Sequence, residues 1–302
     1  MIPYGKQHIS DEDIKAVVEV LKSDFLTQGP VVPQFEQALC DYTGANHAVT
    51  TNSGTSALHL ACRALGLGAG DVLWTTPVTF VASANCALYC DASVDFVDID
   101  PKTFNLSVDA LKTKLEQAEV AGKLPKVVVP VHLCGLPCDM STIAELAKQY
   151  GFSVIEDASH AIGGRYQDKP IGDCRYSDIT VFSFHPVKTI TTGEGGAALT
   201  NDQDLADKMA LLRSHGITRD PEQMTHQPDG DWYYQQVELG YNYRMTDIHA
   251  ALGISQMRRL DEFVERRHDI ANRYDALLHE FPVRSQHRPN NSYSGMHLYI
   301  IR

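Results

Sequence analysis

Short apolar runs and amphipathic stretches alternate along most of the chain, separated by turns rich in glycine, proline and polar residues. Runs rich in β-branched and aromatic residues predict buried strands, and apolar residues at helical spacing predict helices between them. The predicted strands are residues 47–51, 71–76, 94–99, 126–131, 152–157 and 178–184, with one more after the glycines at 193–196. Strands separated by helices in this way predict an α/β fold, with a mostly parallel sheet and helices on both of its faces.

The alternation ends near Met245, and a long helical region follows to about residue 280. We therefore predict an N-terminal segment and large domain over residues 1–245, and a linking helix and the start of a smaller C-terminal α/β domain over 246–302. Residues 296–302 are apolar enough to predict a strand, and no further segment follows to pair with it. This pattern predicts a C-terminal domain that is truncated in the sequence.

Composition excludes several classes of function. A formal net charge of −12 over 302 residues argues against nucleic acid or an anionic membrane as the main partner, because both need clustered cations. The sequence shows neither a signal peptide nor a long apolar run, and its seven cysteines are scattered through apolar segments. This pattern is typical of reduced thiols in a cytoplasmic protein. Two C-x-x-x-C pairs lack a second ligand pair at fitting spacing, so we expect no metal site.

Two candidate reactive residues follow predicted strands. Lys188 lies just beyond the strand at 178–184 and before a glycine cluster, where an amine can form a Schiff base with a carbonyl cofactor. Asp157 ends the strand at 152–157, and ligands of open α/β sheets bind at such carboxyl ends. An aspartate there can keep the pyridine nitrogen of pyridoxal phosphate protonated. Taken singly, Lys188 is equally well a surface lysine and Asp157 a helix N-cap. Together they favour pyridoxal phosphate chemistry.

Other segments offer binding groups. Residues 52–56 form a turn that opens a helix and can cradle a phosphate, although the turn lacks the Gly-Lys-Ser/Thr of a nucleotide-binding loop. Phe80 begins a predicted helix and is either a ring that lies flat on a cofactor or a core aromatic. The loop at 24–30 is either a connector or a substrate loop.

Several motifs together resemble one family. They are NSGTSA at 52–57, TPVTF at 76–80, EDASH at 156–160, SFHPVK at 183–188, GEGG at 193–196, RSHG at 213–216 and GYNYRM at 240–245. With these motifs the chain resembles, almost end to end, the DegT/DnrJ/EryC1/StrS sugar-nucleotide aminotransferases. These are fold-type I enzymes that use pyridoxal 5′-phosphate.

The resemblance implies a role for each matching residue. Lys188 matches the Schiff-base lysine and proton carrier, Asp157 the partner of the pyridine nitrogen, His160 the neighbour of the ring hydroxyl and Phe80 the stacking aromatic. Asn242 matches a residue that reaches the phosphate site from a second subunit, so a homodimer with composite sites is implied. The implied cofactor contacts are Gly54, Thr55, Phe80, Asp157, His160, Ser183, Lys188 and Asn242. The implied substrate contacts are Tyr4, Asp24, Phe25, Leu26, Thr27, Gly54, Ser183 and Asn242.

Three further stretches resemble the subgroup that serves pseudaminic acid biosynthesis: IPYG at 2–5, SDFLTQG at 23–29 and KTITT at 188–192. Those enzymes aminate C4 of a UDP-linked 4-keto-6-deoxy-2-acetamido sugar with L-glutamate, which leaves as 2-oxoglutarate. The alternatives are an aminotransferase of the bacillosamine or perosamine type, a sugar dehydratase of the same fold, and a non-catalytic regulator that binds the cofactor or a sugar nucleotide. Dehydratases carry histidine in place of the Schiff-base lysine, so Lys188 argues against that class. Retention of both Lys188 and Asp157 favours catalysis over mere binding.

Overall fold

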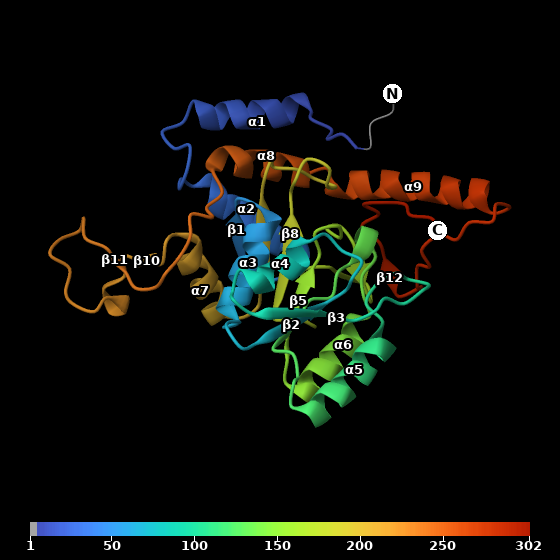
Figure 1. Cartoon of the computed structure of the whole chain (residues 1–302). Helices are drawn as coiled ribbons and strands as arrows, with labels where there is room; N and C mark the ends of the chain where they lie inside the picture. The colour runs from blue at the N-terminus through green and yellow to red at the C-terminus, as the bar shows by residue number, and fades with distance from the viewer. Residues whose placement is uncertain (1–4) are drawn as a thin grey trace.

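A seven-stranded sheet forms the centre of the molecule (Figure 1). The computed structural model describes residues 5–302, so Tyr4, an expected substrate contact, lies outside the described residues. The strand order is β1-β9-β8-β5-β4-β2-β3. The strands are β1 (His47–Thr51), β2 (Val72–Thr75), β3 (Ser93–Phe96), β4 (Val127–Val128), β5 (Ser153–Asp157), β8 (Ile179–Ser183) and β9 (Gly196–Thr200). β9 runs against both of its neighbours and the other pairs are parallel, which confirms the predicted mostly parallel sheet.

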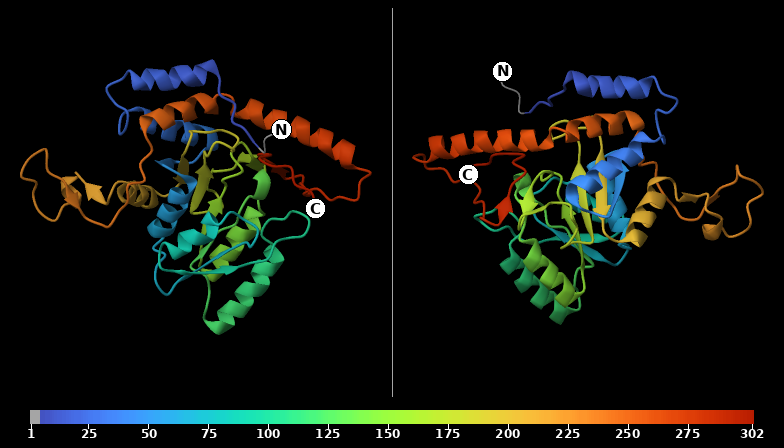
Figure 2. Two further views of the ribbon diagram at one scale, coloured as in Figure 1. Left: turned by 45° about the horizontal axis from the view of Figure 1, so that its top comes forward. Right: turned by 180° about the vertical axis from the view of Figure 1, so that it is seen from behind.

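Helices cover both faces of this sheet (Figure 2). One face packs on α3 (Gly54–Ala64), α4 (Ala82–Leu88) and α7 (Gln203–Arg213). The other packs on α2 (Val31–Thr43), α5 (Val108–Ala121), α6 (Met140–Tyr150) and α8 (Asp247–Met257). Because side chains alternate along a strand, Val181 of β8 enters the first core and Phe182 the second. Burial on both sides explains why the strands are nearly continuous apolar runs in the sequence.

The C-terminal region contains two helices in place of one continuous helical region. α8 is followed by α9 (Leu260–Leu278) after a break at Arg259, and α8 packs against α2 and against α1 (Asp11–Leu21). The division of the chain at residue 245 stays a prediction. Between α7 and α8, β10 (Ile217–Thr218), η2 (Pro221–Gln223) and β11 (Gln235–Gln236) form an arm that projects from the body (Figures 1 and 2).

The strand predicted over residues 296–302 is wrong. β12 (Ser292–Tyr293) ends before it and pairs with β6 (Arg165–Tyr166), which pairs in turn with β7 (Lys169–Pro170). The N–H groups of His297 and Leu298 both donate to the carbonyl of Cys134, at 2.9 and 3.3 Å. A turn carbonyl therefore takes the bonds that a neighbouring strand would need, and the apolar residues are buried without a ladder.

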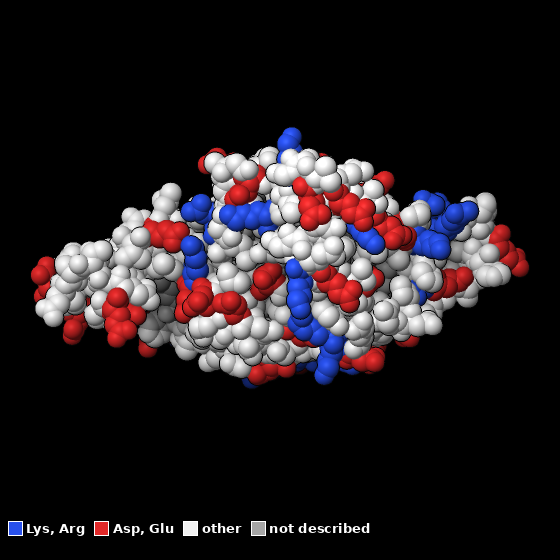
Figure 3. Space-filling model, turned by 90° about the horizontal axis from the view of Figure 1, so that it is seen from below, with Lys and Arg blue, Asp and Glu red and all other residues white. Residues whose placement is uncertain are grey.

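Charges of both signs are mixed on the face seen in Figure 3. Lys and Arg side chains form a short line near its centre, and Asp and Glu side chains lie on both sides of that line. None of the helices within residues 5–302 is long and apolar enough to cross a bilayer.

One buried carboxylate attaches α1 to the body. Ser10 and Asp13 form the capping box expected from the sequence, and Asp13 Oδ2 also accepts hydrogen bonds from Gln256 Nε2 at 2.7 Å and Arg259 Nη2 at 2.6 Å. Burial alone would raise the pKa of Asp13, but the hydrogen bonds and the charge of Arg259 outweigh it and lower the pKa overall.

We expect Asp13→Ala to lower the free energy of unfolding at pH 7 by about 1.5–3 kcal/mol, the usual value of hydrogen bonds to a charged group. Because the folded-state pKa is depressed, this contribution is present above the unfolded pKa of about 3.9 and is lost as the pH falls below it. Urea unfolding at pH 7 and below pH 4 measures both effects. Asp11→Ala, an exposed carboxylate of the same helix turn, is the control, and an equal loss in both variants would contradict the expectation.

Candidate active site

A cavity of about 730 Å³ lies at the carboxyl ends of the sheet strands. The segments that follow β1, β2, β5 and β8 line it, which is where open α/β sheets bind their ligands. It brings together seven of the residues predicted from the sequence: Gly54, Thr55, Phe80, Asp157, His160, Ser183 and Lys188. β5 and β8 are neighbours, so Asp157 and the turn that carries Lys188 leave the sheet side by side.

The remaining predicted residues lie outside this cavity in one copy of the chain. Residues 24–27 link α1 to α2 and do not line the cavity, and Thr27 forms an isolated bridge with Thr246. Asn242 is exposed, and its carbonyl accepts a hydrogen bond from Asn52 of the cavity wall at 3.3 Å. The roles of these residues stay predictions.

Asp157 presents a buried carboxylate held by three donors. Ser83 Oγ of α4 donates to Oδ2 at 2.6 Å, and the N–H and Oγ of Ser159 donate to Oδ1 at 3.1 and 2.6 Å. An ionised carboxylate only accepts hydrogen bonds, so these donors stabilise its charge and fix its orientation. The next element after β5 is strand β6, so Asp157 does not cap a helix.

Lys188 provides an amine that loses its proton more readily than an exposed lysine. It lies in the turn after β8, where its N–H donates to the carbonyl of His185 at 2.9 Å. Burial lowers the pKa of Lys188, and the nearby Asp157 and Cys134 offset only part of this effect. No ion pair is formed by its ammonium within residues 5–302. A partly buried amine of this kind is suited to act as a nucleophile and as a base.

His160 is a neutral ring with a defined tautomer. Its Nδ1 accepts the backbone N–H of Cys134 at 3.2 Å, so the proton lies on Nε2. Burial and the charge of Lys188 lower the pKa of His160 to about 4, against a smaller opposite effect of Asp157. At neutral pH the ring is therefore a hydrogen-bond donor through Nε2.

The start of α3 forms an anion cradle. Ser53 caps the helix by accepting the N–H of Ser56 at 3.1 Å, and the first backbone N–H groups of the helix have no partner within it. A Cβ atom at Gly54 would lie 2.8 Å from Ser183 Cβ, and one at Gly196 would lie 2.6 Å from the nitrogen of Gly54. Both glycines are therefore needed for the helix to begin directly against the ends of β8 and β9. Such a helix start binds phosphate.

These groups fit pyridoxal phosphate in kind. The cradle matches the phosphate, the Asp157 carboxylate matches a protonated pyridine nitrogen, and the Lys188 amine matches a carbonyl carbon. Phe80, 70% exposed at the cavity wall, offers an aromatic face of the size of the pyridine ring. Within residues 5–302, no group of His, Cys, Asp or Glu side chains is arranged to hold a metal ion.

Sequence reasoning missed three donors of the site. Ser159 had a signal, because a hydroxyl two residues after an aspartate commonly closes a local turn. Ser83 lies one helical turn after Phe80 and had a weaker signal. The amide of Cys134 had none, because it points at His160 only through a left-handed residue with φ of 62°.

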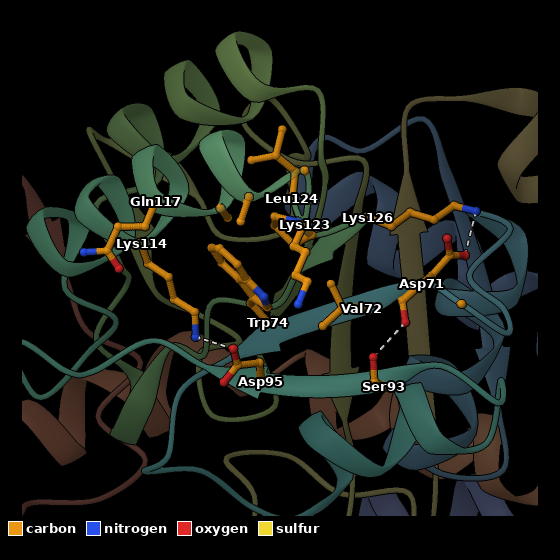
Figure 4. Close-up of a pocket in the computed structure, with 15 residues that line it drawn as sticks. Asp71, Val72, Trp74, Ser93, Asp95, Lys114, Gln117, Lys123, Leu124 and Lys126 are labelled. Carbon is orange, nitrogen blue, oxygen red and sulfur yellow. Dashed lines mark hydrogen bonds and ion pairs between the residues drawn. The ribbon is translucent and has the colours of Figure 1, made fainter.

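A second cavity, of about 750 Å³, lies between α5 and the strands β2 and β3, toward the amino ends of those strands (Figure 4). Its lysines are already used within the protein: Lys114 pairs with Asp95 at 2.7 Å and Lys126 with Asp71 at 2.9 Å. The groups at this cavity stabilise the edge of the sheet and offer no reactive constellation.

Comparison with known proteins identifies relatives of the whole chain. The model of the DegT/DnrJ/EryC1/StrS aminotransferase family matches residues 7–302. A UDP-4-amino-4,6-dideoxy-N-acetyl-beta-L-altrosamine transaminase of Campylobacter jejuni is 42% identical, over 100% of this chain and 76% of its own. A GDP-perosamine synthase of Caulobacter vibrioides is 39% identical, over 94% of this chain and 71% of its own.

Solved structures give the same result. Helicobacter pylori PseC, an aminotransferase of pseudaminic acid biosynthesis, is similar with a TM-score of 0.89 and 35% identity, over 99% of this chain and 76% of that one. A PLP form of a putative sugar aminotransferase is also among the similar structures, and aminotransferases of this family depend on pyridoxal phosphate.

We expect Lys188 to titrate below the usual lysine pKa of about 10.4, because burial disfavours its ammonium. Competitive labelling with trace acetic anhydride over a pH series, followed by peptide mass spectrometry, measures this, with exposed Lys15 as the internal reference. In Asp157→Asn the midpoint should fall further, because Asp157 favours the charged amine. A midpoint at or above about 10.4, or a rise in the variant, would contradict the site geometry.

Proposed function

The chain belongs to the DegT/DnrJ/EryC1/StrS aminotransferase family, and we propose that it moves an amino group from L-glutamate to C4 of a UDP-linked 4-keto-6-deoxy-2-acetamido sugar. The observation that supports this most directly is the convergence of Lys188, Asp157 and the start of α3 on one cavity. A binding protein would need the cradle but neither the shifted amine nor the buried carboxylate.

Pyridoxal 5′-phosphate is the cofactor we propose, held by the groups that fit it. The start of α3, with Gly54, Thr55 and Ser183, would hold the phosphate, and Phe80 would cover the ring. Asp157 would bind the protonated ring nitrogen, and His160 Nε2–H would donate to the ring hydroxyl. When bound, the cofactor supplies an electrophilic carbonyl and a ring that accepts an electron pair.

Lys188 carries the acid–base work in this proposal. Its Nζ would release the cofactor site when substrate arrives, take up a proton there and deliver a proton to sugar C4. Because burial lowers its pKa, a fraction of the amine is neutral and able to accept that proton. A single amine on one side of the cavity delivers the proton to one face of C4, which sets the configuration of the new amine.

The UDP-linked, pseudaminic-type substrate is proposed on the strength of two relatives. Both the Campylobacter transaminase and Helicobacter PseC carry names of that pathway. The Caulobacter GDP-perosamine synthase, at 39% identity, favours a second candidate, a GDP-linked 4-keto-6-deoxy sugar. The two candidates share the amine chemistry and differ in the nucleotide and in the substituent at sugar C2.

We also propose a homodimer in which Asn242 reaches the phosphate site of the partner subunit. Asn242 is exposed beside Asn52 at the cavity wall, and the arm before it exposes large apolar side chains, with Trp232 71% and Leu239 70% exposed. Exposed apolar residues on a projecting arm favour coverage by another chain. The seven cysteines are all unpaired thiols, which supports work in the cytoplasm.

The proposed reaction is tested with defined acceptors and L-glutamate, with products identified by NMR. The acceptors are UDP-2-acetamido-2,6-dideoxy-β-L-arabino-hexos-4-ulose, its D-xylo epimer at C5, and GDP-4-keto-6-deoxymannose. We expect a preference of about 10-fold or more for the L-arabino sugar, because a mismatched polar group leaves buried partners unpaired. Lys188→Ala is the control for background amination. Preference for the GDP sugar would replace the first candidate with the second, and preference for the D-xylo sugar would indicate a bacillosamine-type enzyme.

A further inference from the structure

A second histidine packs against His160 from a distant part of the chain. His297, which follows β12, lies with its ring centroid 4.4 Å from that of His160, at an interplanar angle of 37°. It is 7% exposed and does not line the cavity itself. It therefore supports His160 from the side away from the cavity.

The backbone around His297 also holds the turn that bonds His160. This turn is η1 (Leu133–Gly135), and its Cys134 N–H donates to His160 Nδ1 at 3.2 Å. The carbonyl of Cys134 accepts the N–H of His297 at 2.9 Å, and the carbonyl of Gly135 accepts the N–H of Gly295, also at 2.9 Å. The turn is thus fixed between His160 on one side and residues 295–298 on the other.

Three backbone segments meet at Gly135 with no space for a side chain. Gly135 has φ of 102°, and a Cβ atom there would lie 2.7 Å from the nitrogen of Met296 and 2.9 Å from the carbonyl oxygen of His160. Cys134 itself adopts φ of 62°, a conformation that costs free energy for a residue with a side chain and persists only where its surroundings impose it. The contacts from residues 295–298 are those surroundings.

We propose that His297 is a positioning residue, which together with the Cys134 amide fixes the ring plane and the Nε2–H tautomer of His160. The geometric part of this inference stands on the chain alone. Its consequence for catalysis rests on the proposed function, in which His160 Nε2–H faces the ring hydroxyl of the cofactor.

The charged groups around the pair favour two neutral rings. Lys188 and Asp157 face His160 from the cavity side, and Arg267 of α9 donates to the carbonyl of His297 at 3.1 Å. Burial lowers the pKa of His297 to about 2, with further contributions from His160, Lys188 and Arg267. His297 Nδ1 has no hydrogen-bond partner within residues 5–302. The ring therefore acts through packing and exclusion of water, which a phenyl ring can reproduce.

Nitrogen-15 NMR of the histidine rings in the full chain, without cofactor, tests this directly, and His160→Asn assigns the His160 signals. In wild-type protein and in His297→Phe we expect His160 as the Nε2–H tautomer with a pKa near 4. In His297→Ala, water reaches the ring, so the pKa of His160 should rise toward the ordinary value of about 6.5 and both tautomers should be populated. Tyr299→Phe, which removes one hydrogen bond of the same segment to Asp275, should leave His160 unchanged.

The pH dependence of kcat/KM in the holoenzyme gives a second readout. Protonated His160 cannot accept the Cys134 N–H and adds a positive charge beside Lys188, so His297→Ala should lose activity as the pH falls below about 6.5. Wild-type protein and His297→Phe should not. An unchanged tautomer and pKa of His160 in His297→Ala would overturn the proposal, as would a His297→Phe variant that shifts His160. If His297→Ala does not fold, the result with His297→Phe decides in the same way. The NMR result holds even if the proposed reaction fails.

Discussion

The site depends on one buried charge, the carboxylate of Asp157. A charge at the end of a central strand is costly to bury unless hydrogen bonds compensate for the lost water. Ser83 and Ser159 supply those bonds, and Ser83 also ties the start of α4 to the end of β5. The same burial lowers the pKa of Lys188. One constraint therefore sets both the fixed charge and the reactive amine, and places them on one cavity.

Much of this arrangement could be predicted from the sequence, for a physical reason. Asp157 and Lys188 follow apolar runs that form neighbouring parallel strands, and the carboxyl ends of such strands meet at one edge of a sheet. The helix start at Gly54 was likewise predictable from its polar turn. The rest depends on tertiary contacts that leave little local trace. Residues 296–302 carry strand-forming side chains, yet their N–H groups bond a turn that lies far away in the sequence.

His297 illustrates the same limit. In the sequence it is one histidine in an apolar run, and only the fold places it against His160. The left-handed Cys134 that joins them is not a residue type that announces such a conformation. Asn242 and residues 24–27 present the complementary case, since family resemblance assigns them to the site but a single chain leaves them outside the cavity. Their placement calls for a second copy.

The central claim is that Lys188 and Asp157 form the amine-transferring centre of a pyridoxal phosphate enzyme. Adding L-glutamate alone to the purified, cofactor-loaded chain tests it most directly. The account predicts one equivalent of 2-oxoglutarate per cofactor, with conversion of the bound cofactor to its pyridoxamine form followed by absorbance. In Asp157→Asn this conversion should slow by about a hundredfold or more, the effect of losing roughly 3 kcal/mol of charge stabilisation. No release of 2-oxoglutarate by the wild-type chain, or an equal rate in Asp157→Asn, would contradict the claim.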